Sequence, residues 1–227
     1  MNQTIANVFS LFFVFALLLF VSKFSLADYY FAKADSDFKL ALTLDEPEKS
    51  NSFNQALYHL ENSSKYRTRH AEALDLKGEI YYRLWWLNPD GRYLTDSNLL
   101  QKSKALHLQA LQERQEWPYT MLQLAKLEAH KPFLDQDFYF RFDQAYQFGR
   151  YETSIGLELM KLGILRWQQL DIESRKKVID LTHIAVQQKR NNLNDIKNSL
   201  ETSDLFDYMC VNIEKTPRQN DLCGLSR

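Results

Sequence analysis

The chain has 227 residues, a formal net charge of −1, and ordinary proportions of apolar (45%) and charged (25%) residues. A near-neutral chain has no global attraction to nucleic acid or to an anionic surface, and its length is enough for a domain with its own core. Six glycines and five prolines stand against fifteen phenylalanines and twelve tyrosines, which favours long helices over a turn-rich sheet and predicts an all-α fold.

The N-terminal run over residues 5–22 is uncharged and dominated by Phe, Leu and Val. As a helix it spans about 27 Å, close to the thickness of the hydrocarbon core of a bilayer. We therefore predict a single-pass membrane anchor over residues 1–27. The alternative is a signal peptide cleaved after Ala27, because Ser25 and Ala27 are small residues at the two positions that signal peptidase requires. The length of the run, and the absence of Lys or Arg before it, favour the anchor.

Two sets of residues give opposite indications about orientation. Lys23, Lys33 and Lys39 follow the apolar run, which by the positive-inside rule places the following domain in the cytoplasm. The cleavage pattern and the two cysteines, Cys210 and Cys223, indicate the other side, because so short a separation permits a disulfide in an oxidising compartment. Two free thiols would show the same spacing, so the residues alone leave the orientation open.

Apolar periodicity predicts one helical domain over residues 28–210, followed by an extended tail over residues 211–227. In its first helix, beginning near residue 27 or 28, Phe31, Ala34, Phe38 and Ala41 share one face. The next helix starts near residue 50 and is expected to end at Asn62-Ser63-Ser64. The remaining patterns predict helices near residues 69–87, 97–115, 117–131, 138–149, 152–168, 172–188, 193–200 and 203–209, with a turn at residues 88–91.

The helices come in pairs with small residues at the expected crossings. Gly78 and Tyr81 match the Gly-x-x-Tyr of a tetratricopeptide first helix, and Ala125 and Gly163 stand at comparable places. A glycine inside a helix costs about 1 kcal/mol relative to alanine, so we expect a close approach of a second helix there. The pattern is interpreted as a degenerate tetratricopeptide-like array of helical hairpins; an irregular helical bundle would bury the same residues.

No catalytic or metal-binding pattern is present in the sequence. The five histidines form no His-Glu-x-x-His frame and pair with no nearby cysteine, and there is no Gly-rich phosphate loop and no Gly-x-Ser-x-Gly. Basic pairs such as Lys176-Lys177 are too small for a nucleic-acid site. The prediction is therefore a protein that is not an enzyme, with no cofactor, no metal and no nucleic-acid partner.

Aromatic residues are the one enriched class with binding potential. Their flat faces and polar edges can stack on sugars, although packing between helices is the favoured interpretation. The candidates are Tyr81, Tyr82, Trp85, Trp86, Trp117 and Trp167. Neighbours such as Trp85 and Trp86 point in different directions along a helix, so we expect at least one of them to be less buried.

Two segments resemble a known family. Residues 113–119 read Glu-Arg-Gln-Glu-Trp-Pro-Tyr and lead into a helical run to Ala129, and residues 145–152 read Ala-Tyr-Gln-Phe-Gly-Arg-Tyr-Glu. With Gly163 and Trp167 they resemble the segments of bacterial exopolysaccharide-biosynthesis accessory proteins of the VpsP type. Helical regions of O-antigen-ligase-like membrane proteins are similar. Arg150 and Tyr151 stand where that family has Pro and Trp.

The resemblance covers about residues 114–181, and its motif positions are expected to be structural: Trp117, Pro118, Gly149, Glu152, Gly163 and Trp167, beside Gly78 and Tyr81 of the repeat. It implies an accessory or scaffold protein of exopolysaccharide biosynthesis or export, anchored in the inner membrane of a Gram-negative bacterium. Its domain would lie on the periplasmic side, with a polysaccharide polymerase, ligase or export component, and secondarily the polysaccharide, as partner. The alternatives are a periplasmic carbohydrate-binding or carbohydrate-modifying protein that uses the aromatic surface, and a cytoplasmic adaptor.

Overall fold

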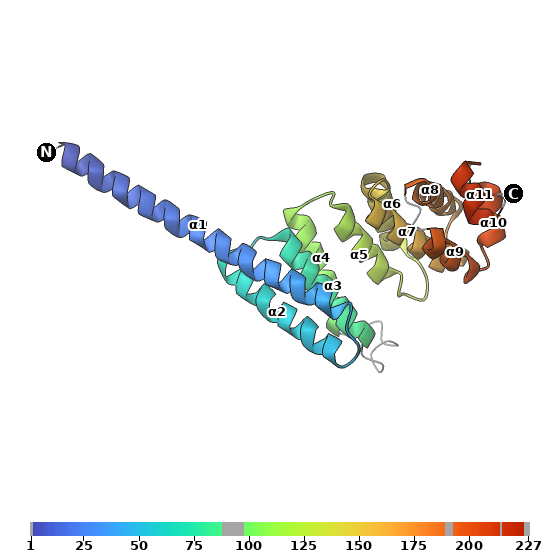
Figure 1. Cartoon of the computed structure of the whole chain (residues 1–227), viewed down its shortest axis with the longest axis horizontal. Helices are drawn as coiled ribbons and strands as arrows, with labels where there is room; N and C mark the ends of the chain where they lie inside the picture. The colour runs from blue at the N-terminus through green and yellow to red at the C-terminus, as the bar shows by residue number, and fades with distance from the viewer. Residues whose placement is uncertain (1, 88–97, 189–192, 214, 225–227) are drawn as a thin grey trace. The chain divides into compact units, whose positions relative to one another are not determined.

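A computed structural model describes residues 2–87, 98–188, 193–213 and 215–224, with side chains from residue 11 onward (Figure 1). Within these ranges every regular element is a helix, which confirms the all-α prediction. The turn predicted at residues 88–91 lies outside the described residues.

The chain forms two compact units, Met1–Glu113 and Arg114–Arg227. The single helical domain predicted over residues 28–210 is thus divided after Glu113. The helices of the first unit are α1 (Asn2–Ala41), α2 (Glu48–Tyr66), α3 (Ala71–Leu87) and α4 (Asn98–Glu113). Those of the second unit are α5 (Pro118–Glu128), α6 (Gln136–Gly149), α7 (Thr153–Leu165), the short 3-10 helix η1 (Trp167–Gln169), α8 (Ile172–Gln188), α9 (Leu193–Glu201), α10 (Phe206–Asn212) and α11 (Pro217–Cys223).

Consecutive helices pair as hairpins, α1 with α2 and α3 with α4 in the first unit, α5 with α6 and α7 with α8 in the second. The first hairpin shows why consecutive helices pair closely. Ala27, Ala34 and Ala41 repeat every seven residues along α1 and are fully buried, while Phe31 and Phe38 between them are partly buried. Alternation of small and large side chains at this spacing lets a second helix approach closely and interdigitate. The predicted face of this helix is confirmed.

Two helix ends predicted in this hairpin are wrong. The first helix does not begin near residue 27 or 28, because α1 runs unbroken from Asn2 to Ala41. The second helix does not end at residues 62–64 but continues to Tyr66. There the hydroxyl of Ser63 faces the hairpin instead of capping a helix end: it is fully buried and donates to the carbonyl of Ala27 at 2.9 Å.

In the second unit the start of α5 is as predicted, with Trp117 at the N-cap and Pro118 at the first helical position, where its missing N–H is harmless. The turn predicted between the next two helices is also confirmed, since α6 ends at Gly149 and Glu152 is the N-cap of α7. A Cβ on Gly149 would come within 2.7 Å of Ile155 and 2.8 Å of Pro118, so this glycine permits a close contact of the turn with both neighbouring helices.

The helix predicted over residues 152–168 ends at Leu165, and a 3-10 turn carries Trp167. The helix is largely buried, as expected, but Leu165 itself is exposed. Its Gly163 packs directly against α8, where a Cβ would lie 2.2 Å from Cγ2 of Val178. The expected close approach at Gly163 is therefore confirmed.

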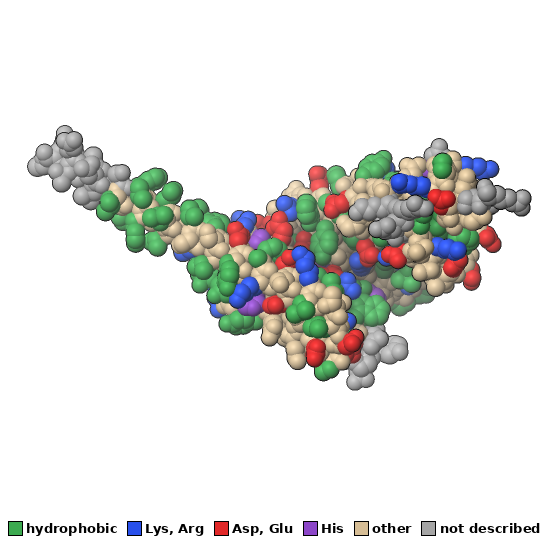
Figure 2. Space-filling view, viewed as in Figure 1, with side chains coloured by type: hydrophobic (Ala, Val, Ile, Leu, Met, Phe, Trp, Pro, Cys, Tyr) green, Lys and Arg blue, Asp and Glu red, His purple; other side chains and the backbone are tan. Residues whose placement is uncertain are grey.

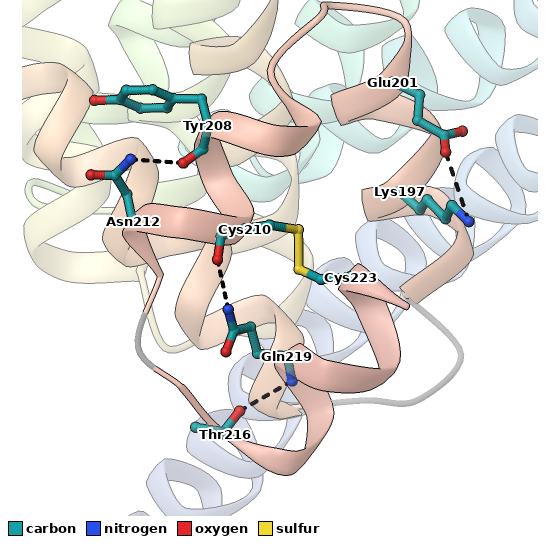
Figure 3. The surroundings of a disulfide bond; sticks show 8 residues. All are labelled: Lys197, Glu201, Tyr208, Cys210, Asn212, Thr216, Gln219 and Cys223. Carbon is teal, nitrogen blue, oxygen red and sulfur yellow. Dashed lines mark hydrogen bonds and ion pairs between the residues drawn. A yellow bond between two sulfur atoms is a disulfide. The ribbon is translucent and has the colours of Figure 1, made fainter. Parts of the chain in front are cut away.

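The extended tail predicted over residues 211–227 is also wrong where the structure describes it. Thr216 caps α11 by accepting a hydrogen bond from the Gln219 N–H, and Pro217 begins the helix. A disulfide joins Cys210 of α10 to Cys223 of α11, with 5.9 Å between their Cα atoms (Figure 3). A cross-link of this kind holds two short helices that bury few side chains of their own.

Candidate functional site

The segment Leu11–Val21 of α1 is apolar and has no protein packed around it. From Leu11 to Val21 its large hydrophobic side chains are between 51% and 77% exposed. Among the described residues α1 is the helix long and apolar enough to cross a membrane, by length and composition alone. Figure 2 shows its hydrophobic side chains following one another along the helix before charged side chains begin. Such a surface is stable in a lipid environment and unfavourable in water.

The packed half of α1 begins directly where the exposed half ends. Lys23 is the first charged residue, and Ala27, four residues later, is already fully buried against α2. The small residues that resemble a signal-peptidase site, Ser25 and Ala27, are helical here. The structure therefore presents the apolar segment and the hairpin as one continuous rod.

A second notable group is a buried polar cluster between α3 and α4. Nδ1 of His107 lies 2.8 Å from Oδ1 of Asp75, and both side chains are almost fully buried. The ring fits against Gly78, where a Cβ would meet Nε2 of His107 at 2.7 Å. The expected close approach at Gly78 is confirmed, and the glycine is what admits the imidazole. At 1% exposure His107 is inaccessible to a substrate, so the pair acts within the core.

The same hairpin buries further polar groups. The Oε1 atom of Glu79 accepts a hydrogen bond from Nε of Arg83 at 2.7 Å. Ser103 is fully buried one turn before His107 on α4. Serine, histidine and aspartate thus occur in one hairpin, but the burial of Ser103 and His107 keeps a substrate from the hydroxyl. These polar groups fix how α3 and α4 pair.

Three carboxylates at the link between α5 and α6 lie close enough to hold a cation. Ligand oxygens of Glu128, Asp135 and Asp137 are within 4.8 Å of one another. The ammonium of Lys131 contacts both Glu128 and Asp135. Burial opposes the charge on Lys131, but hydrogen bonds to these carboxylates outweigh it and raise its pKa, and the bond to Lys131 lowers the pKa of Asp135. Lys131 is therefore the cation of this cluster, and Asp135 also caps α6.

The loop that carries this cluster is tied to the end of α7. Nη2 of Arg166 donates to the carbonyl of Lys131 at 2.9 Å and to Oε1 of Gln169 at 2.7 Å. His130 lies in the same loop, where burial and the nearby charge of Arg166 lower its pKa to about 4. His107 thus has a carboxylate beside it, whereas His130 has a guanidinium nearby.

The aromatic candidates divide between core and surface. Trp85 and Trp167 are buried, whereas Trp86 is 42% exposed, so the expected difference between Trp85 and Trp86 is confirmed. Trp117 is half-buried, with the guanidinium of Arg114 3.9 Å from its ring centroid. Tyr81 is half-buried on α3 with Lys102 over its ring. The rings are divided between the two units: Trp85 and Trp86 belong to the first, Trp117 and Trp167 to the second.

An open cavity of about 540 Å³ lies between α7 and α9. Trp167 borders it, together with side chains that offer hydroxyl, amide and ammonium groups. The lining consists of Lys161, Ile164, Leu165, Trp167, Gln168, Ser199, Thr202 and Ser203. With Trp167 only 7% exposed, the indole presents too little surface to stack on a sugar ring.

The predicted structural residues are spread through the hairpins, and Trp167 also contacts the Tyr208 ring of α10. Gly78 and Gly163 face partner helices, while Trp117, Pro118, Gly149 and Glu152 mark helix starts and turns. Sequence reasoning missed His107, Asp75 and Ser63, which form hydrogen bonds between the two helices of their hairpins. The glycine at 78 was the available signal for His107, and the alanine spacing of α1 was the signal for Ser63.

Comparisons of the chain with protein-family models, with curated proteins and with solved structures found no match.

Proposed function

We propose that the chain is a membrane-anchored accessory or scaffold protein that acts through protein–protein contacts and carries out no catalysis. The observation that carries the proposal is the continuity of α1. Its exposed apolar half passes without a break into the half that packs against α2. An anchor of this construction holds the attached helical hairpins at a membrane surface, and helical-hairpin arrays offer extended surfaces for partner proteins.

The biological process in this proposal is exopolysaccharide biosynthesis or export at the inner membrane of a Gram-negative bacterium. It rests on the resemblance of residues 114–181 to proteins of the VpsP type, and the partner would be a polymerase, ligase or export component. The joined Cys210 and Cys223 support a periplasmic position for the second unit, because disulfides persist in oxidising compartments.

A genetic experiment with matched variants tests anchor and process together. The gene is deleted and complemented with the wild type, with Val14→Arg/Leu18→Arg, or with Tyr58→Arg. All three residues are exposed large hydrophobic or aromatic side chains, but only the first two lie on the apolar segment. Each arginine at a bilayer centre costs about 3 kcal/mol, so we expect the double variant to leave the membrane fraction and to lose polymer, while Tyr58→Arg behaves as wild type.

Normal polymer yield in the deletion strain would exclude the process. Membrane retention of the double variant would exclude the anchor. Orientation has its own measurement: alkylation of thiols in intact cells, before any reduction, should leave Cys210 and Cys223 unmodified. Free thiols at both positions would favour the cytoplasmic orientation that the charge rule indicates.

A second candidate function, binding of a sugar, has its place at the cavity beside Trp167. The polar groups there suit a saccharide, while the burial of the indole disfavours stacking. Titration of oligosaccharides from the producing strain into the full chain tests it; a Thr202→Trp variant, which fills the cavity, should abolish any binding found.

A further inference from the structure

The corner between α2 and α3 lies beside the point where the exposed apolar half of α1 ends. Two hydrogen bonds fix the antiparallel register of the α1/α2 hairpin. The hydroxyl of Ser63 donates to the carbonyl of Ala27 at 2.9 Å, and that of Ser52 donates to the carbonyl of Asp37 at 3.0 Å. In this register the last turn of α2 runs alongside the residues just before Ala27.

Contacts between α1 and the end of α2 confirm this register. The guanidinium of Arg67 lies 5.9 Å from the ring centroid of Phe24, and its Nη1 is 3.7 Å from Oδ1 of Asp28. The rings of Tyr30 and Tyr66 stack with centroids 6.1 Å apart. Residues some forty positions away in sequence are thus held at the end of the apolar segment.

The side chains of this corner are those that suit a lipid headgroup layer. Tyr66 is 38% exposed, and tyrosine is enriched where hydrocarbon meets water. Basic residues with exposed or partly exposed side chains lie in this corner or on the adjoining part of α1: Lys23, Lys65, Arg67 and Arg69. The acidic residues nearby include Asp28, Glu61, Glu72 and Glu113, of which Glu113 lies 3.8 Å from Arg69.

We propose that residues 65–69, with Lys23, form a collar that contacts the phosphate groups of the phospholipids around α1. This inference rests on the proposed function, in which α1 spans the membrane. If residues 5–22 fill the hydrocarbon core, the helix enters a headgroup layer roughly 6 Å thick immediately after them. Because α1 is a continuous helix at that point, the collar is held at the membrane surface. The α1/α2 hairpin then extends from that surface without a linker.

Depth measurements with single nitroxide labels test the collar in the full chain. The native cysteines are paired with each other, so a methanethiosulfonate label reacts with one introduced cysteine at a time. The three sites are Leu18→Cys on the apolar segment, Thr68→Cys in the corner and Gln55→Cys on α2, all exposed positions. Gln55 lies about 20 Å farther along the hairpin than Thr68. The probe membrane is a vesicle of phosphatidylcholine, with or without phosphatidylglycerol.

We expect collision with oxygen and with a water-soluble nickel complex to place the label at position 18 deep in the bilayer. The label at position 68 should lie within about 6 Å of the phosphate level, and that at position 55 in water. A deep label at 18 with a label at 68 as aqueous as that at 55 would overturn the collar and leave the anchor intact. A label at 18 in water would overturn the anchor itself.

Charge reversal tests the phosphate contact separately. In phosphatidylglycerol vesicles, Lys65→Glu/Arg69→Glu should shift the label at position 68 toward water, because anionic headgroups repel the new carboxylates. Lys39→Glu, a change at an exposed lysine of the same hairpin, should leave the label where it is. An unchanged depth in the double variant would overturn the contact with phosphate.

Discussion

The α3/α4 and α7/α8 hairpins both use a glycine to let two helices approach closely, but the contact at that glycine is polar in the first and apolar in the second. In α3/α4 Gly78 makes room for His107, whose imidazole is bonded to the buried carboxylate of Asp75. In α7/α8 Gly163 makes room for Val178 and the contact is apolar. The small residue in the first helix is what close pairing requires, whereas the group that fills the space from the second helix is free to vary. A polar filling specifies one pairing because it leaves a buried group unpaired in any other.

The largest effect is expected from breaking the polar hairpin. His107→Leu keeps an apolar side chain against Gly78 but removes the imidazole that lies 2.8 Å from Oδ1 of the buried Asp75. Leaving a buried carboxylate without that bond should destabilise α3/α4 by about 3 kcal/mol. Hydrogen exchange of the full chain in detergent, read from peptides of α3 and α4, measures the loss.

The matched control is Asp75→Leu/His107→Leu, which removes both polar groups. Replacement of a whole buried pair by apolar residues is far less unfavourable than removal of one partner. If the double variant exchanges as fast as His107→Leu, the loss arises from packing and the polar interpretation of this hairpin is wrong.

A smaller effect is expected from adding one methyl group to each glycine. In Gly163→Ala the Cβ would lie 2.2 Å from Cγ2 of Val178, and in Gly78→Ala it would lie 2.7 Å from Nε2 of His107. Overpacking of this kind destabilises by about 2 kcal/mol, partly offset by the better helix propensity of alanine. Overpacking should appear as faster hydrogen exchange confined to the hairpin that carries the substitution. Exchange at the wild-type rate in both variants would mean that the helices can move apart without loss of stability.

Rescue distinguishes the two fillings. Val178→Ala removes the methyl groups that Gly163→Ala would meet, so the double variant should be about 1 kcal/mol more stable than the sum of the single changes predicts. His107→Ala makes the same space for Gly78→Ala but also removes the hydrogen bond between the imidazole and Asp75. We expect no net rescue there, and equal rescue in both hairpins would remove the distinction between them.

The sequence predicted the helices and both glycine contacts, because a glycine retained inside an apolar helical pattern usually has a packing role that offsets its poor helix propensity. It could not predict the partners, since His107 and Val178 are defined by the register of a second helix. Ser63 was assigned to a helix end because serine there is common; only the opposing Ala27 shows that its hydroxyl is buried. The helix start expected near residue 27 or 28 followed a change in composition, which the backbone of α1 does not need to follow. The exposed apolar segment, the main feature of the candidate site, was readable directly from residues 5–22.

The smallest effect is expected from the titration of His130. Burial and the charge of Arg166 lower the pKa of His130 to about 4, against about 6.5 in an unfolded chain. As pH falls from 6.5 towards 4 the unfolded state binds a proton that the folded state refuses, so this contribution to the stability of the second unit is complete above pH 6.5 and declines below it. Because His130 is only partly shielded from water, the decline should be modest. Urea unfolding of wild type and of His130→Gln at pH 7 and pH 5 measures it, and the variant should show the shallower dependence. Equal dependence in the two proteins would mean that His130 accepts its proton as readily when folded, and that the guanidinium of Arg166 does not oppose it.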